Sequence, residues 1–188
     1  MNNKSFYLKK YKEYFDISNP INNKINCEDL NNIVRLDLSQ IHQFGVFANK
    51  DINKNEIITY YPAHYIYKLN EYSIYNINLI LPNNFKDYVY TLDQYNNIEI
   101  IGHPDITGNM NWVGHKINDG YKHNYKSNTK KNRSLYNKKT KKYNNATFAY
   151  SNEDEKISVI VTKNIKKDEE ILVSYGFDYW LHRNKILL

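Results

Sequence analysis

Most of the chain consists of short apolar or alternating runs that polar turns separate. Runs rich in β-branched and aromatic residues predict strands that begin near residue 33 and at 44–48, 57–61, 88–92, 98–101, 146–150 and 157–162. Helical spacing of apolar residues predicts one short amphipathic helix at 5–15. Many short strands with irregular loops indicate a β-rich α+β domain rather than alternating βαβ units.

The last apolar run, Ile171-Leu172-Val173, stops at Ser174-Tyr175-Gly176, and several aromatic residues follow. Glycine lets the backbone bend sharply there without a Cβ clash, so the phenol of Tyr175 is expected at the edge of whatever cavity the strand faces. On residue type alone, a tyrosine in the core beside a plain turn is the better interpretation.

The length of 188 residues suits one domain, which we expect at 33–180, between an N-terminal extension at 1–32 and a tail at 181–188. A single cysteine and six histidines without close spacing predict no disulfide and no metal site. No apolar stretch reaches the ~20 residues that a membrane span needs. We therefore expect a soluble, intracellular protein without membrane contact.

The formal net charge is +6, and much of the basic charge lies in an insertion at about 120–143. Residues 120–152 contain no acidic side chain, while basic residues crowd at Lys122, Lys126, Lys130, Lys131, Arg133, Lys138, Lys139, Lys141 and Lys142. Such a run is either a solvated insertion or a contact surface for polyanions such as DNA, and the first interpretation is the more common one.

Three separated stretches together resemble one family. Residues 39–48 with 51–58 resemble the opening of a SET domain, the lysine methyltransferase fold, and 108–115 resemble its second motif. Residues 145–148 and 164–176 resemble its last part, so the resemblance covers about 33–180. It implies a fold of short strands and small sheets, with a C-terminal segment that passes through a loop beside the second motif.

The resemblance implies an S-adenosylmethionine-dependent protein-lysine N-methyltransferase. In such a protein, Tyr175 is the catalytic tyrosine and also borders the cofactor. The other cofactor-binding positions that the resemblance implies are Gln43, Phe44, Gly45, Gly114 and His115, with Trp180 either against the adenine or simply capping the core.

A lysine must lose its proton before its amine attacks a sulfonium methyl, and a narrow aromatic channel favours the neutral amine by desolvation. Candidate channel residues are Tyr88, Tyr90, Val173 and Tyr179, although ordinary strand packing is the better interpretation of Tyr88 and Tyr90 taken alone. Val173 stands where relatives often carry a Phe or Tyr that limits methylation. The smaller side chain predicts products beyond monomethyl-lysine.

Two residues depart from the family pattern. Gln43 stands in place of the first glycine of a Gly-x-Gly turn, and Gly114 replaces an asparagine that holds the amino end of the cofactor. Asn118 or Asn111 could take over that contact, and spacing leaves both open. Because of these departures, an alternative function stays open, namely a catalytically silent SET-like module that binds protein or nucleic acid.

The resemblance also implies a protein substrate, with a histone tail favoured and a non-histone protein as the alternative. A basic enzyme needs a local acidic groove to hold a basic tail. Candidate contributors are Asp87, Asp93, Glu99 and Asp105, which could equally be solvated surface charges. A histone substrate would imply a nuclear or chromatin-associated protein.

Overall fold

The computed structural model describes residues 30, 32–68, 88–93, 98–105, 109–151 and 156–186. The chain divides into two compact units. Unit 1 contains Met1–Asn32, Ile58–Lys116 and Ala149–Val159, and unit 2 contains Ile33–Ile57, Ile117–Phe148 and Ile160–Leu188. The helix expected at 5–15 and nearly all of the N-terminal extension lie outside the described residues.

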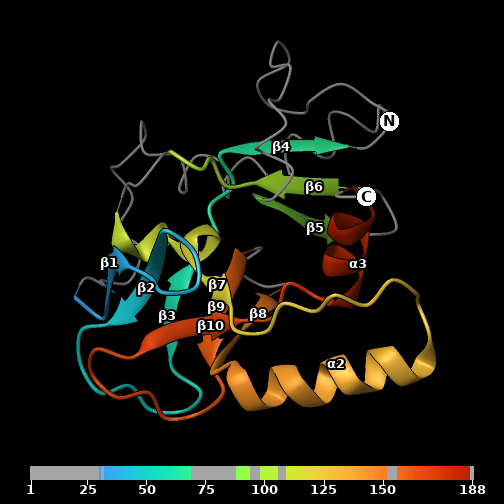
Figure 1. Cartoon of the computed structure of the whole chain (residues 1–188). Coiled ribbons are helices and arrows are strands. Elements are labelled where there is room, and N and C mark those ends of the chain that lie inside the picture. Colours follow the sequence, from blue (N-terminus) through green and yellow to red (C-terminus); the bar gives the residue numbers. More distant parts are fainter. Residues whose placement is uncertain are drawn as a thin grey trace. The chain divides into compact units, whose positions relative to one another are not determined.

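Unit 2 is built on a four-stranded sheet (Figure 1). Its strands are β1 (Val34–Leu38), β2 (Phe44–Ala48), β10 (Glu170–Val173) and β7 (Asn118–Asp119), in the order β1-β2-β10-β7. β10 pairs antiparallel with β2 and parallel with the two-residue β7. The C-terminal segment therefore lies beside the residues that follow the second motif, as the resemblance implied.

Alternation of apolar and polar residues decides which face of this sheet is buried. Val46 and Ala48 on β2 and Ile171 and Val173 on β10 are all fully buried. Successive strand residues point to opposite faces, so each of these pairs lies on one face of its strand. Burying one such valine or isoleucine contributes about 1.5–3 kcal/mol.

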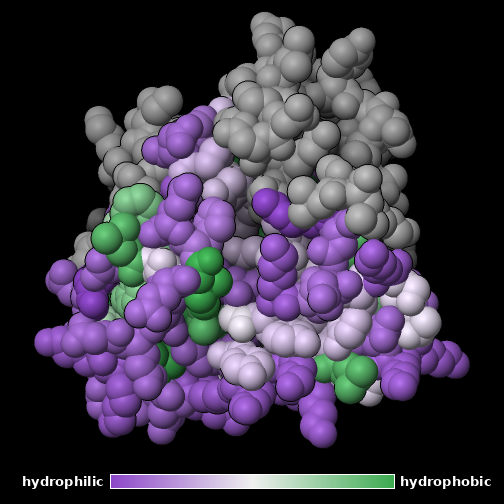
Figure 2. Space-filling view, viewed as in Figure 1, coloured by the Kyte–Doolittle hydropathy of each residue, from purple (hydrophilic) through white to green (hydrophobic). Residues whose placement is uncertain are grey.

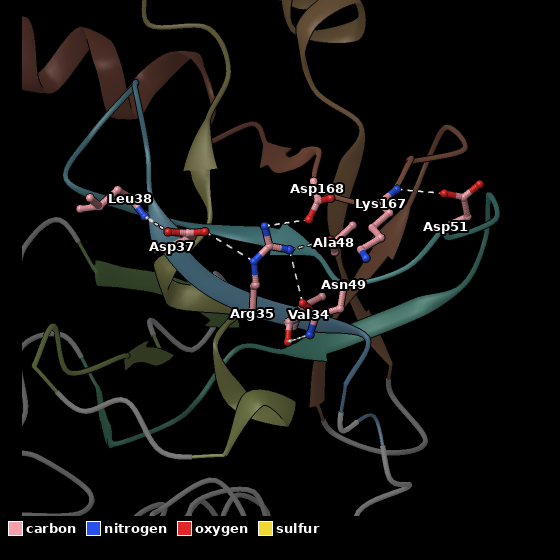
Figure 3. A network of polar contacts seen from close by, with 9 residues as sticks. All are labelled: Val34, Arg35, Asp37, Leu38, Ala48, Asn49, Asp51, Lys167 and Asp168. Atoms are coloured by element: carbon pink, nitrogen blue, oxygen red, sulfur yellow. Dashed lines mark hydrogen bonds and ion pairs between the residues drawn. The ribbon is translucent and has the colours of Figure 1, made fainter.

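Arg35 ties the β1–β2 hairpin to the turn that precedes β10 (Figure 3). Its guanidinium lies 3.0 Å from Asp168 Oδ1 and 3.5 Å from Asp37 Oδ2, and it donates a hydrogen bond of 2.9 Å to the carbonyl oxygen of Ala48. Five donors in a planar fork allow one arginine to hold several partners at once. This clamp holds the open end of the β1–β2 hairpin against the turn that precedes β10.

Two helices complete unit 2, α2 (Lys130–Tyr143) and α3 (Phe177–Ile186). The Thr129 side chain caps α2 by accepting a hydrogen bond from Asn132 N at 3.1 Å, and Lys141 and Lys142 lie in the last turn, where the helix dipole favours positive charge. Tyr136 is the anchor of α2. It is buried in a cluster with Phe177, Trp180 and Leu181 of α3.

Unit 1 contains a three-stranded sheet in the order β4-β6-β5, with β4 at Tyr65–Lys68, β6 at Ile98–Ile101 and β5 at Val89–Asp93. Ile98, Ile100 and Ile101 of β6 are fully buried. A second sheet has the order β3-β9-β8, from Ile57–Tyr60, Lys156–Val161 and Ala146–Ser151, and the boundaries between the units fall within these strands. Two 3-10 turns, Met110–Trp112 and Gly114–Lys116, carry the second motif.

The eight strands expected from the sequence, including the run that ends at Val173, are all present within one or two residues, which confirms the β-rich α+β class. The sequence did not predict β4, β7 or the helices α2 and α3. None of the helices in the described part of the chain has the length and hydrophobicity that crossing a membrane requires.

Candidate active site

Tyr175 lies directly after β10 and is fixed at two points. Its backbone amide donates a hydrogen bond of 2.9 Å to Asp119 Oδ2, and its hydroxyl donates one of 2.7 Å to the carbonyl oxygen of Ile117. The next residue, Gly176, has φ +95°, a conformation that side chains rarely adopt, so the sharp turn expected there is present. The phenol is only half-buried, so it borders solvent as a reacting group must.

Aromatic rings of α3 surround Tyr175. Its ring centroid lies 5.0 Å from that of Tyr179 in an edge-on arrangement and 5.9 Å from that of Trp180, to which it is nearly parallel. Trp180 is buried and donates its indole hydrogen to Asp119 Oδ2 at 2.8 Å. These contacts describe Trp180 as a core residue, and its contact with an adenine stays a prediction.

The turn that the sequence resemblance implies as a cofactor contact is built from Gln43, Phe44 and Gly45. Gln43 has φ +24° and so takes a conformation that glycine favours, while Phe44 is exposed at the start of β2. A Cβ on Gly45 would lie 2.2 Å from Glu170 Oε1. Only glycine therefore lets the carboxylate of Glu170 approach the backbone of this turn so closely.

Asn118 lies beside the same turn. Its side-chain amide donates to the carbonyl oxygen of Phe44 at 3.0 Å and to Glu170 Oε1 at 2.9 Å, while Ser39 Oγ donates to Glu170 Oε2 at 3.0 Å. Of the two asparagines that the sequence left open, Asn118 belongs to the same unit as the Gln43–Gly45 turn and Asn111 to the other unit. The result is a polar corner with one carboxylate, which suits a cation.

The remaining predicted site residues lie in unit 1. A Cβ on Gly114 would lie 2.8 Å from the backbone oxygen of Tyr60, so glycine is required there by packing. His115 is buried, with its ring 6.4 Å from that of Tyr88 and 5.6 Å from that of His64. Gly108, which opens this motif, lies outside the described residues.

Tyr90 on β5 packs its ring 5.6 Å from that of Tyr61, whose hydroxyl donates to the carbonyl oxygen of Tyr88 at 2.5 Å. Burial raises the pKa of Tyr90, so its phenol stays neutral near pH 7. Tyr90 thus has the strand packing that was the alternative to a channel role, while Tyr88 lies just before the strand with its ring 6.4 Å from that of His115. Their channel role stays a prediction.

His64 is the most strongly perturbed group in this part of unit 1. Its Nδ1 accepts a hydrogen bond of 2.7 Å from the backbone amide of His103. Burial, assisted by the nearby positive charges of His103 and Lys116, lowers the pKa of His64 from 6.5 to about 4. The imidazole is therefore neutral near pH 7.

The predicted site residues thus fall into two groups. Unit 2 brings together Tyr175, Tyr179 and Trp180, with Val173 fully buried on β10 two residues before Tyr175, and separately Gln43, Phe44 and Gly45 beside β10. Unit 1 holds Tyr88, Tyr90, Gly114 and His115. Reasoning from the sequence missed Asp119, Glu170 and Tyr136. Asn118-Asp119-Gly120 has the composition of an ordinary turn, and Tyr136 is one aromatic residue within a Lys-rich run, so Asp119 and Tyr136 carried no signal. Glu170 lay in the stretch 164–176 that the family resemblance covered, which was the signal that could have found it.

The SET domain family model matches residues 43–176. The match spans well over half of the chain and includes the Gln43–Gly45 turn, the second motif and Tyr175. The chain belongs to the SET domain family, and this membership supports a methyltransferase activity. A comparison with curated proteins found no match.

Solved structures with the same fold agree with this assignment. The methyltransferase domain of human PR domain-containing protein 2 is 20% identical, with a TM-score of 0.50, over 79% of this chain and 80% of that one. The ATXR5 SET domain, solved in complex with dimethylated histone H3, is 19% identical, with a TM-score of 0.50, over 80% of this chain and 62% of that one. At these identities the likeness establishes the fold.

Proposed function

We propose that this protein is an S-adenosylmethionine-dependent protein-lysine N-methyltransferase. The observation that carries the proposal is the geometry of Tyr175, whose phenol is half-buried, faces the aromatic rings of α3 and is held by Ile117 and Asp119. A tyrosine so fixed in a member of this family can orient a substrate amine. Positioning of this kind supplies a large part of an enzyme's rate.

The substrate amine has to be neutral, and a free lysine has a pKa of about 10.4. Low polarity around an ammonium group disfavours its charge, and the rings of Tyr175 and Tyr179 provide such surroundings. A phenol oxygen accepts as well as donates. Tyr175 Oη can therefore accept a hydrogen from the amine while it donates its own to Ile117, and this directs the nitrogen lone pair.

The corner at Gly45 fits the cationic methionine end of the cofactor. Gly45 allows close backbone approach, and the carboxylate of Glu170, held by Asn118 and Ser39, supplies a negative charge beside it. When bound, S-adenosylmethionine supplies an electrophilic methyl group on a sulfonium. Asn118 takes the place of the asparagine that Gly114 replaces, because it is the candidate that shares a unit with the Gln43–Gly45 turn.

We further propose a histone tail as the substrate and, as its consequence, a nuclear or chromatin-associated location. The structure of the ATXR5 SET domain with histone H3 supports this choice for a protein of the same fold. Among the acidic candidates for a groove, Asp93 and Glu99 lie on the paired strands β5 and β6, while Asp87 lies outside the described residues. A non-histone substrate remains the competing proposal.

Calorimetry with S-adenosylmethionine and transfer of a tritiated methyl group test this function together. We expect saturable cofactor binding and label in core histones, with label in other proteins of a whole lysate identifying a non-histone substrate instead. Tyr175→Phe removes only the hydroxyl and should slow transfer about 100-fold while cofactor affinity stays the same. Equal rates for Tyr175→Phe and the parent would refute the role of Tyr175.

A silent SET-like binding module is the second candidate function, because Gln43 and Gly114 replace residues that hold the cofactor in relatives. The same calorimetry separates the two functions. No heat of binding at millimolar cofactor would reject the enzyme and support the module.

The Lys-rich insertion supports a DNA contact for either function. Successive residues of an α-helix are about 100° apart, so Lys131, Lys138 and Lys142 project roughly opposite to the buried Tyr136. All three are exposed, and Figure 2 shows mostly hydrophilic surface where Figure 1 places α2. At 1.5 Å per residue they are spaced by roughly 10 and 6 Å along the helix, so they form one basic row that several phosphates of a nucleic acid can contact.

A further inference from the structure

A tyrosine of the Lys-rich insertion reaches the turn that carries Tyr175. Tyr136, from the middle of α2, is only 1% exposed. Its hydroxyl oxygen lies 2.7 Å from Ser174 Oγ and accepts a hydrogen bond of 3.1 Å from the backbone amide of Gly176. Tyr136 therefore contacts the residues immediately before and after Tyr175.

The hydrogen bonds of this hydroxyl are fully accounted for. Burial, the largest effect, raises the pKa of Tyr136, so the phenol keeps its hydrogen. That hydrogen is donated to Asp119 Oδ2 at 3.2 Å, and the oxygen accepts from Gly176 N and from the Ser174 hydroxyl. One donor and two acceptor positions are all that a phenol has.

Asp119 is the second member of the network. It is 4% exposed, and Oδ2 accepts from Tyr136 Oη, Tyr175 N and Trp180 Nε1 at 3.2, 2.9 and 2.8 Å. Its other oxygen accepts from the backbone amide of Tyr121 at 2.9 Å. A buried carboxylate is stable only with such partners, and it ties them to each other because losing one exposes charge to an apolar interior.

We propose that Tyr136 and Asp119 are positioning residues that hold Tyr175 in its reactive orientation, and that the insertion helix is thereby part of the active site. The inference rests on the proposed function of Tyr175. Three consecutive residues, Ser174, Tyr175 and Gly176, are held through this pair, so the phenol cannot shift unless the network breaks. Small displacements of a reacting group cost large factors in rate.

Tyr136→Phe removes the hydroxyl and keeps the ring that packs against Phe177 and Trp180. We expect kcat to fall at least about tenfold, because the variant loses all three hydrogen bonds of the hydroxyl, while KM and the cofactor dissociation constant stay within about twofold of the parent values. Tyr143→Phe is the matched control, because Tyr143 lies on the same helix, is 44% exposed and stacks on Tyr121 instead. It should leave kcat unchanged.

Amide hydrogen exchange gives a readout that needs no activity. Gly176 N also lies 3.2 Å from Ser174 Oγ, so Tyr136→Phe should speed its exchange about fivefold, and adding Ser174→Ala should speed it further. Val46, buried in β2, serves as the internal reference for global unfolding. Tyr143→Phe should change neither amide.

The outcomes separate the network from the function. Unchanged exchange at Gly176 in both Tyr136→Phe and the double variant would overturn the network. Faster exchange with an unchanged kcat would overturn the positioning role. If the parent protein transfers no methyl group at all, the proposed function fails and the positioning role fails with it, while the exchange data still decide whether Tyr136 holds this turn.

Discussion

Gly114 shows how a single residue decides which side chains the second motif can carry. A Cβ there would lie 2.8 Å from the oxygen of Tyr60 and 3.0 Å from the nitrogen of Tyr61, and both are backbone atoms that cannot move aside cheaply. The family pattern that the sequence resembles has asparagine at this position. Restoring that asparagine here would introduce a clash before it could introduce a contact.

Gly114→Asn should therefore destabilise the protein by about 1–3 kcal/mol, the usual cost of overpacking. Urea unfolding measures the change. Gly114→Ala is the matched control and should cost nearly as much, because the clash arises at Cβ. An asparagine variant as stable as the parent would contradict this account. If that variant also bound the cofactor more tightly, the asparagine side chain would be able to contact the amino end of the cofactor after all.

His64 predicts a pH dependence of stability. Its pKa is lowered from 6.5 to about 4 in the folded protein, so between these values the unfolded chain binds more protons. The contribution of His64 to the free energy of unfolding is therefore fully present above pH 6.5. It is lost as the pH falls towards 4, and the loss reaches about 3 kcal/mol. Protonation also ends the role of Nδ1 as acceptor for His103 N.

His64→Asn tests this prediction, because an amide oxygen can replace Nδ1 as an acceptor and does not titrate. Between pH 7.5 and pH 4.5, the free energy of unfolding should fall about 2–3 kcal/mol less for the variant than for the parent. Equal losses in the two proteins would mean that His64 is not the group responsible.

The sequence predicted Tyr175 and the sharp turn at Gly176, because both depend on local residue type. It could not predict that Asp119 bonds to Tyr175 N or that Tyr136 bonds to Gly176 N. Those hydrogen bonds join residues about 40 or more positions apart. They depend on where the sheet and α2 bring the chain back, which no local pattern encodes.

Among the secondary-structure elements, α2 is the one that differs most from the sequence interpretation. Its residues carry neither an apolar stripe nor alternating charge, so no periodic signal exists. Three features stabilise the helix in their place, namely the Thr129 cap, the basic residues of the last turn and the buried ring of Tyr136. Strands such as β2 and β9 were predictable because aromatic and β-branched residues between polar turns mark them directly.

The outer face of α2 predicts salt-dependent DNA binding. Replacing Lys131, Lys138 and Lys142 with glutamine should weaken binding and reduce the slope of log K against log salt by about 2–3, close to 0.9 for each phosphate that the variant no longer neutralises. Titration of a fluorescent duplex at several salt concentrations measures the slope.

The control for that experiment replaces three exposed lysines elsewhere in unit 2, Lys50, Lys54 and Lys167, and so removes the same charge. It should leave most of the slope intact. If both triple variants reduced the slope equally, net charge alone would explain the binding and α2 would not be a DNA site.

For the molecule as a whole, the sequence predicted the family, the class of fold and most strands, because each motif sits on a strand or a turn with a local signature. It did not predict the division into two units, which depends on contacts between distant segments. For the same reason, the sequence did not predict that the site residues would be divided between the two units.

The place of β10 has a consequence for how the protein comes to be folded. β10 leaves the ribosome after the other strands of its sheet, yet it lies in the interior of that sheet between β2 and β7. Its partners are more than 120 residues earlier in one case and about 54 in the other, as the pairs Glu170–Phe47 and Leu172–Asn118 show. Long-range pairings of this kind form slowly. The edges of β2 and β7 that face β10 must therefore stay unpaired in the nascent chain until β10 has been synthesised. A chaperone that shields strand edges should accordingly increase the fraction of chains that fold correctly.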